Sequence, residues 1–184
     1  MAIFHLIRPN AQSKALLIEP VPYLFERLQR NYSDLPGCIL ANVAIAAVSG
    51  SASIYHIDPD ARKYFPALPP YFEELASFDK TKIAQILGER ATSLLREKVV
   101  KTAPLRSLLR ENGITRVDLL QIDTEGYDYE VLKTFPFDLS LPVLVSFEHC
   151  HLSERDRAAA FCLVVSRGYS VERWGKDFVC VRRT

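Results

Sequence analysis

Residues 119–128 constrain the fold of this chain more than any other segment. The segment begins with apolar residues typical of a buried β-strand and ends in a cluster of Asp123, Glu125, Gly126 and Asp128. Carboxylates are costly to bury without partners, so the acids mark where the strand leaves the core. Open α/β sheets bind ligands at the carboxyl ends of parallel strands, and we therefore expect a site here. The alternative is a strand-to-helix turn in which Asp128 caps the next helix.

Strand and helix patterns alternate along the rest of the chain. Continuous apolar runs predict buried parallel strands at 15–18, 38–41, 118–122 and 143–147. Helices are predicted after Pro22, Pro104 and Ser153, the last with a capping arrangement. A terminal antiparallel hairpin is predicted around Gly175. The expected fold class is therefore α/β, with a mostly parallel sheet and a C-terminal antiparallel hairpin.

Residues 58–98 have a different character. Prolines and aromatic residues crowd the first part of this segment: Pro59, Tyr64, Phe65, Pro66, Pro69, Pro70, Tyr71 and Phe72. We interpret it as an insertion that covers one end of the sheet, either as local packing or as a substrate lid. The chain of 184 residues, with 48% apolar residues, otherwise fits a single domain with its own core.

Charge and hydropathy exclude several classes of partner. The 23 basic and 22 acidic residues give no electrostatic basis for binding nucleic acid or an anionic membrane. No apolar run approaches the roughly 20 residues needed to cross a bilayer, and the first residues do not resemble a signal peptide. The four cysteines are widely spaced, as is typical of reduced thiols. We expect a cytoplasmic protein, and the oligomeric state stays open.

A second acid, Glu19, follows the predicted strand at 15–18. A carboxylate offers two acceptor oxygens and no donor, which suits the two hydroxyls of a nucleotide ribose. An acid at a strand end is commonly just solvated. The Asp123 cluster at the end of another strand strengthens the prediction that Glu19 belongs to a binding site. We expect Glu19 and Asp123 to open into one shared crevice.

Several segments together carry a family resemblance. Residues 17–22, 48–55 and 118–128, with Val131 and Leu132, resemble the FkbM family. Members of this family are class I methyltransferases that use S-adenosylmethionine and mostly modify hydroxyl oxygens. The resemblance extends over about 15–147, and its most specific part is 122–128. It implies a Rossmann-like class I methyltransferase fold.

The resemblance also implies roles for particular residues. Glu19 and the adjacent Pro20 would bind the cofactor ribose, and Asn42 would lie near the adenine. Asp123 would face the methyl group or the acceptor hydroxyl, with Glu125 beside it as a further catalytic acid. The implied cofactor is S-adenosylmethionine.

His149 and His151 flank Cys150 after the predicted strand at 143–147. A metal held by all three is not expected, because alternate residues of a strand point to opposite faces. Either histidine suits the role of general base, since imidazole titrates near neutral pH. We assign His149 to the catalytic group and assign no metal ligands; a packing or surface histidine is the alternative.

One departure from the family pattern concerns the first residues. The family begins with a strand and a glycine-rich loop, but none of the seven glycines lies within the first 36 residues. Residues 1–10 instead carry Ile3, Phe4 and Ile7 at helical spacing. We expect that the chain starts inside a longer protein, after a strand that would lie between those at 15–18 and 119–122.

The predicted function is S-adenosylmethionine-dependent O-methylation of a hydroxyl on a small molecule or sugar. Two alternatives stay open. A non-catalytic remnant or interaction module would explain the missing glycine loop. A nicotinamide-dependent oxidoreductase is disfavoured because no G-x-G-x-x-G motif occurs in the chain.

Overall fold

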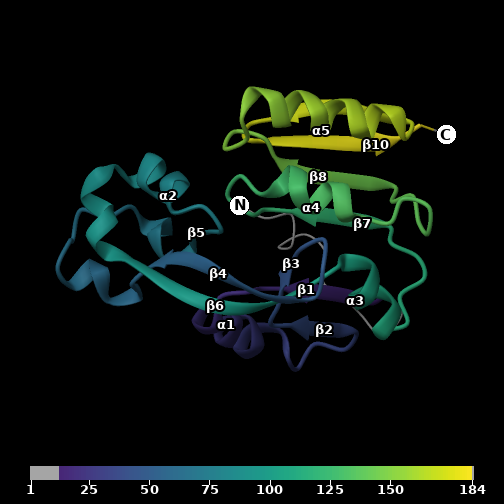
Figure 1. The fold of residues 1–184 in the computed structure, drawn as a ribbon. Helices are drawn as coiled ribbons and strands as arrows, with labels where there is room; N and C mark the ends of the chain where they lie inside the picture. Colours follow the sequence, from purple (N-terminus) through teal and green to yellow (C-terminus); the bar gives the residue numbers. More distant parts are fainter. Residues whose placement is uncertain (1–12, 184) are drawn as a thin grey trace.

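The chain folds into helices and three small β-sheets, described by a computed structural model over residues 13–183 (Figure 1). The side chains of residues 70 and 89–91 fall outside this description. The α/β class predicted from the sequence is confirmed. No helix in the described range is long and apolar enough to cross a membrane. The helical pattern predicted for 1–10, and the strand expected before it, concern residues outside the described range.

The C-terminal sheet has the order β7-β8-β10-β9. Its strands are β7 (Leu119–Ile122), β8 (Leu144–Glu148), β9 (Tyr169–Trp174) and β10 (Asp177–Arg182). β7 and β8 are parallel, whereas β8, β10 and β9 pair antiparallel, which confirms the predicted terminal hairpin. Helices α4 (Asp128–Thr134) and α5 (Glu154–Ser166) pack together, α4 against β7 and α5 against β9. Val145, Ser146 and Phe147 are each at most 2% exposed in this core, as expected for a strand covered on both faces.

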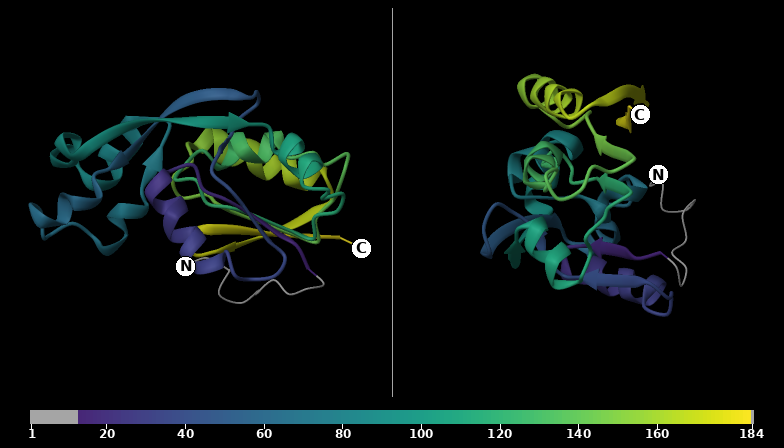
Figure 2. Two further views of the ribbon diagram at one scale, coloured as in Figure 1. Left: turned by 90° about the horizontal axis from the view of Figure 1, so that it is seen from below. Right: turned by 90° about the vertical axis from the view of Figure 1, so that its right-hand side faces the viewer.

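A separate two-stranded sheet contains β1 (Ala15–Ile18) and β2 (Cys38–Ala41). The strands are parallel and connected by α1 (Pro22–Tyr32), which begins with a proline as predicted. Within the described residues β1 pairs only with β2, and β7 pairs only with β8. Figure 1 and the right view of Figure 2 show this separation: the purple β1–α1 segment lies at one end and the yellow C-terminal elements lie at the other.

The third sheet, with the order β3-β6-β4-β5, lies between them in sequence. It contains β3 (Ala44–Ile45), β4 (Gly50–Ile57), β5 (Ala76–Ser77) and β6 (Leu95–Ala103), and α3 (Leu105–Glu111) follows it. β6 runs parallel to β3 and antiparallel to β4, whose pairing extends from Gly50 opposite Thr102 to Ile57 opposite Leu95.

The prediction of a mostly parallel sheet is therefore wrong. Among the described strands three pairs are parallel and four are antiparallel. The error has a physical cause. Continuous apolar runs reveal strands buried on both faces, but β4 and β6 are half-exposed and mix serine, lysine and apolar residues. Their pairing joins residues 38 to 52 positions apart, which no local pattern specifies.

The segment between β4 and β6 forms a unit with its own small core. It contains the 3-10 helices η2 (Pro59–Lys63), η3 (Pro70–Glu74) and η4 (Glu89–Leu94), together with α2 (Lys80–Leu87). Ile57, Ala61, Phe72, Ile83 and Leu94 pack together there. The left view of Figure 2 shows this teal-blue segment projecting to one side of the sheets. Its interpretation as an insertion at 58–98 stays a prediction.

Candidate active site

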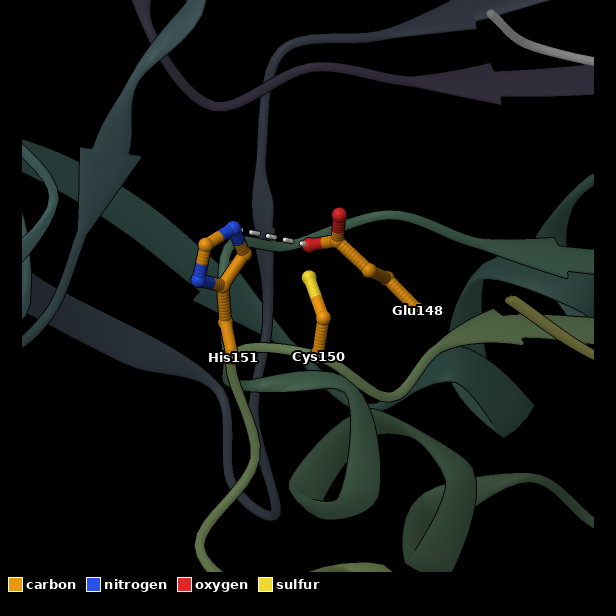
Figure 3. A group of neighbouring side chains, drawn as sticks. All are labelled: Glu148, Cys150 and His151. Atoms are coloured by element: carbon orange, nitrogen blue, oxygen red, sulfur yellow. Dashed lines mark ion pairs between the residues drawn. The ribbon is translucent and has the colours of Figure 1, made fainter. Parts of the chain in front are cut away.

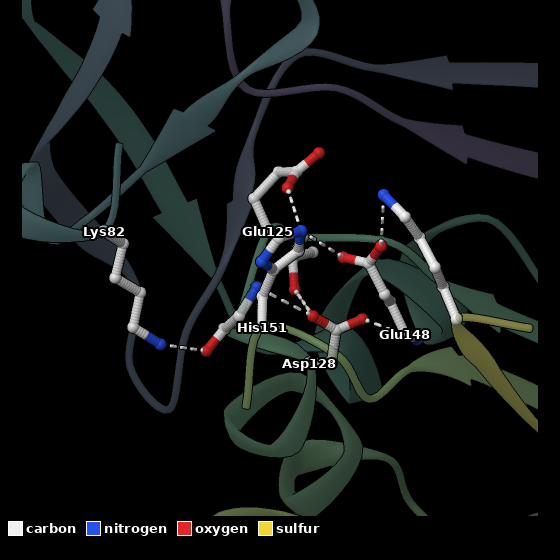
Figure 4. A network of polar contacts seen from close by, with 8 residues as sticks. Lys82, Glu125, Asp128, Glu148 and His151 are labelled. Atoms are coloured by element: carbon white, nitrogen blue, oxygen red, sulfur yellow. Dashed lines mark hydrogen bonds and ion pairs between the residues drawn. The ribbon is translucent and has the colours of Figure 1, made fainter. Parts of the chain in front are cut away.

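The acidic turn follows β7 directly. Ile122 is buried at the end of the strand, and Asp123 is exposed as the chain leaves the sheet. Glu125 has a φ of 52° and Gly126 a φ of 93°, so two successive residues are in the left-handed region. This region costs a non-glycine residue roughly 1–2 kcal/mol, and such strain concentrates at functional sites. The turn directs the Glu125 side chain toward His151 (Figure 4).

Asp128 connects this turn to β8. Its fully buried carboxylate accepts hydrogen bonds from Thr124 Oγ1 at 3.0 Å and from Gly126 N at 3.2 Å. Its other oxygen accepts from the backbone N–H of Glu148, at 3.2 Å. Burial raises the pKa of Asp128 to about 6, although these hydrogen bonds lower it. Asp128 therefore acts as a structural residue that holds two strand ends together.

Gly126 lies where two other segments converge on the turn. A Cβ atom at this position would lie 2.7 Å from the backbone oxygen of His151 and 2.7 Å from Lys82 Nζ. Lys82, on α2, donates a hydrogen bond of 2.5 Å to the Gly126 carbonyl (Figure 4). Glycine is required both for the positive φ and for this close approach.

Replacing Gly126 with alanine is expected to lower the free energy of unfolding by about 2 kcal/mol, because the new methyl group meets a backbone oxygen and the φ is unfavourable. Chemical denaturation followed by circular dichroism measures the change. Gly113→Ala is the matched control: it also has a positive φ, of 63°, but no atom lies within 4 Å of its added Cβ. Equal losses in the two variants would show that the contact at Gly126 contributes nothing.

The second strand end brings another group of polar side chains to the same place. β8 ends at Glu148, and the chain then turns over 149–152, with Leu152 N donating to the His149 carbonyl. Cys150 and His151 lie beside Glu148 (Figure 3). The prediction that strand alternation would separate Cys150 from both histidines is wrong, because the strand ends before His149.

His151 lies between the two strand ends. Its Nε2 is 3.5 Å from Glu125 Oε2 and 3.7 Å from Glu148 Oε2 (Figure 4). Both of these carboxylate oxygens are buried and lack a hydrogen-bond partner in the described part of the chain. Lys176 Nζ lies 3.9 Å from the other oxygen of Glu148, but its side chain is 70% exposed.

The acids raise one another's pKa values. Burial, and then the charges of Glu148 and Asp123, raise the pKa of Glu125 to about 7. Burial likewise raises the pKa of Glu148, and it lowers that of His151. Burial therefore favours the neutral form of the His151 imidazole. An added positive charge or hydrogen-bond donor would stabilise the ionised form of the two carboxylates.

A pocket of about 390 Å³ opens at this cluster. Its lining combines the ends of β7 and β8, the start of β10 and the segment between β4 and β6. The lining residues are Tyr71, Glu74, Leu75, Ile86, Gln121, Asp123, Glu125, Glu148, His151, Lys176 and Asp177. Five of them carry carboxylates, so the pocket is suited to cations and to neutral groups that donate hydrogen bonds.

Comparison with known proteins assigns the chain to a family. The family described as the methyltransferase FkbM domain matches residues 4–173. The chain belongs to the FkbM methyltransferase domain family. The resemblance seen in the sequence is thereby confirmed.

A curated relative of this FkbM-family chain is "Methyltransferase sdnD" from Sordaria araneosa. The two are 27% identical over 148 residues, which cover 70% of this chain and 54% of the relative. The chain thus spans about half the length of the curated relative it matches. No solved structure shows a significant match.

The FkbM chain brings some of its predicted site residues together and not others. Asp123 and Glu125 line the pocket, but His149 does not. His149 is 1% exposed and packs against the ring of Phe178, with 4.4 Å between ring centroids. Its burial lowers its pKa and removes it from contact with a substrate in this pocket. His151 occupies the place that the sequence analysis expected for His149.

The predicted cofactor residues form a second group at the end of β1. Asn42 Nδ2 donates hydrogen bonds to the carbonyls of Glu19 and Pro20, at 2.8 and 3.1 Å. Glu19 Oε1 accepts from Val21 N at 2.7 Å, and burial raises the pKa of Glu19 to about 7. None of these residues lines the pocket that contains Asp123, so that pocket is not the shared crevice expected from the sequence.

The sequence analysis did not assign Glu148 or Lys176 to the site. Glu148 had a visible signal, since it ends a predicted strand just as Glu19 does. Lys176 had none, because a lysine in a hairpin turn is common on any surface. Only the pairing of β10 with β8, which places Asp177 opposite Glu148, brings Lys176 to the pocket.

Proposed function

We propose that this chain is an S-adenosylmethionine-dependent methyltransferase with a Rossmann-like fold that methylates a hydroxyl of a small molecule or sugar. Its membership of the FkbM family supports this, as does its relative named a methyltransferase. The pocket volume of about 390 Å³ lies in the range of small-molecule sites.

The observation that carries the proposal is the convergence of two parallel strands on one pocket. β7 delivers Asp123 and Glu125, and β8 delivers Glu148 and the following His151. Ligands of open α/β sheets bind at such carboxyl ends. Asp123, as the exposed acid of the group, would accept the proton of the acceptor hydroxyl or orient that hydroxyl toward the methyl group. His151 takes the supporting role first assigned to His149.

Glu19 and Asn42 fit the ribose of the methyl donor. Val21 N is the hydrogen-bond donor to Glu19 in the described residues, so the second carboxylate oxygen is available to a ligand. Two ribose hydroxyls would donate to this buried carboxylate and replace the hydration it has lost. Asn42 positions Glu19 through the backbone. Bound S-adenosylmethionine would supply the electrophilic methyl group, and the residues described above would align and deprotonate the acceptor.

Calorimetric titration with S-adenosylmethionine tests this assignment. We expect saturable binding, weakened at least tenfold in Glu19→Gln, because hydrogen bonds to a charged group contribute about 1.5–3 kcal/mol. Glu26→Gln is the matched control, since Glu26 lies exposed on the neighbouring helix α1. Equal affinities of the two variants would remove Glu19 from the cofactor site.

A non-catalytic member of the family is the second candidate. The observation that favours it is that Glu19 and Asn42 do not line the pocket of Asp123. The same titration decides between the two, because a non-catalytic chain that has lost its cofactor site releases no binding heat with S-adenosylmethionine.

A further inference from the structure

Two buried carboxylate oxygens face the same imidazole nitrogen in the acidic pocket. They are Glu125 Oε2 and Glu148 Oε2, and neither has a hydrogen-bond partner in the described residues. The Glu148 side chain is only 9% exposed and points into the pocket (Figure 4). A buried polar atom without a partner costs about 1–3 kcal/mol, and more when it is charged. A ligand that binds the buried Glu148 oxygen would remove this cost.

The spacing between the His151 nitrogen and each of these oxygens is close to that between two ligands of one metal ion. His151 Nε2 lies 3.5 Å and 3.7 Å from the two oxygens. Ligand atoms bound at ~2.0–2.2 Å to a tetrahedral zinc lie roughly 3.3–3.6 Å from one another. Further donors lie close: Cys150 Sγ is within 4.8 Å of donor atoms of Glu148 and His151, and an Asp123 oxygen is within 4.8 Å of donor atoms of Glu125 and Glu148 (Figure 3).

The protein's own cations do not fulfil this role. His151 is too far from either oxygen for a hydrogen bond, which needs about 3.2 Å or less. Lys82 already donates to the Gly126 carbonyl. Lys176 reaches only the other oxygen of Glu148, at 3.9 Å, from an exposed position.

We propose that Glu148, Cys150 and His151, whose donor atoms all lie within 4.8 Å of one another, bind a divalent transition-metal cation, with Glu125 and Asp123 within reach as additional ligands. Imidazole and thiol donors favour zinc-like ions, whereas Mg²⁺ prefers oxygen ligands and water. The cation site does not depend on methyl transfer. If the proposed function holds, the ion would also lower the pKa of an acceptor hydroxyl bound to it.

The test is a Zn²⁺ titration of the metal-free full chain in competition with a chromogenic chelator, with Mg²⁺ titrated in parallel. We expect one Zn²⁺ per chain and weaker binding of Mg²⁺. Glu148→Gln and His151→Ala should each weaken Zn²⁺ binding at least tenfold, since each removes one of three ligands. The matched controls are Glu154→Gln, at an exposed carboxylate, and His56→Gln, at a histidine outside the pocket. Both should retain the parent affinity.

Three outcomes would overturn the proposal: no saturable Zn²⁺ binding by the folded chain, full binding by Glu148→Gln and His151→Ala, or equal binding of Mg²⁺ that is insensitive to His151→Ala. Circular dichroism checks that each variant is folded. Should Glu148→Gln unfold, Cys150→Ser provides the same test from the turn after β8. Binding of S-adenosylmethionine is measured by calorimetry in the presence of EDTA, which removes the metal. Loss of the cation site then appears only in the Zn²⁺ titration, and loss of the cofactor site appears only in the calorimetry.

Discussion

The Asp128→Ala variant is expected to unfold with a free energy about 4 kcal/mol lower than that of the parent chain. The Asp128 side chain is fully buried and accepts hydrogen bonds from two backbone N–H groups, of Gly126 and Glu148, and from the Thr124 hydroxyl. Its removal leaves both N–H groups unpaired in the interior, at roughly 1–3 kcal/mol each, and adds the loss of the third bond.

Urea denaturation at neutral pH measures this loss. Asp138→Ala is the control, because it removes an ion pair with Arg106 in which both side chains are more than half exposed. Such surface pairs contribute about 0–1 kcal/mol. A loss below about 1 kcal/mol in Asp128→Ala would show that water or a shifted backbone satisfies the two N–H groups, and that Asp128 does not hold the strand ends together.

The Asp123→Ala variant is expected to methylate its acceptor at least a hundredfold more slowly than the parent chain. General-base catalysis contributes about 10²–10⁴ in rate, and Asp123 is the exposed pocket acid at the end of β7. Burial and the charge of Asp177 raise the pKa of Asp123, which makes it a stronger base than a free aspartate. Two of the other four pocket acids, Glu125 and Glu148, each direct a buried oxygen toward His151 instead.

The measurement is the transfer of labelled methyl groups from saturating S-adenosylmethionine to a hydroxyl compound that the parent chain methylates. Asp138→Ala is again the control, because it removes a carboxylate that does not line the pocket. A general base affects turnover at saturating acceptor, whereas a purely binding residue affects the KM. Unchanged turnover in Asp123→Ala would remove Asp123 from the chemistry.

Strain and unpaired charge coincide in one short turn of this protein. Glu125 has a left-handed backbone and a buried oxygen without a partner, and its pKa is raised to about 7. Gly126, beside it, permits contact with Lys82 and His151. The left-handed backbone and the unpartnered oxygen of Glu125 destabilise the chain without a ligand, so a structural role alone does not account for them. They are the features expected where binding energy from a ligand offsets the loss of stability.

Local sequence patterns were sufficient to predict those strands and helices whose own residues follow a recognisable pattern. The continuous apolar runs of β1, β2 and β7 predicted these strands because burial on both faces requires apolar residues at successive positions. Ser153 predicted the start of α5, where its hydroxyl accepts from Asp156 N. Half-exposed β4 and β6 lacked such a signal, and their antiparallel pairing overturned the expected sheet.

The sequence by itself determined the family and the acidic end of β7, because both depend on residues that are consecutive in the chain. Only the tertiary structure decided which side chains lie beside the acidic end of β7. Backbone torsions after Glu148 turn His151 into the pocket and His149 into the core, and the register of β10 on β8 adds Lys176. Those torsions and that register depend on packing between segments far apart in sequence, so two histidines only two positions apart lie in different environments.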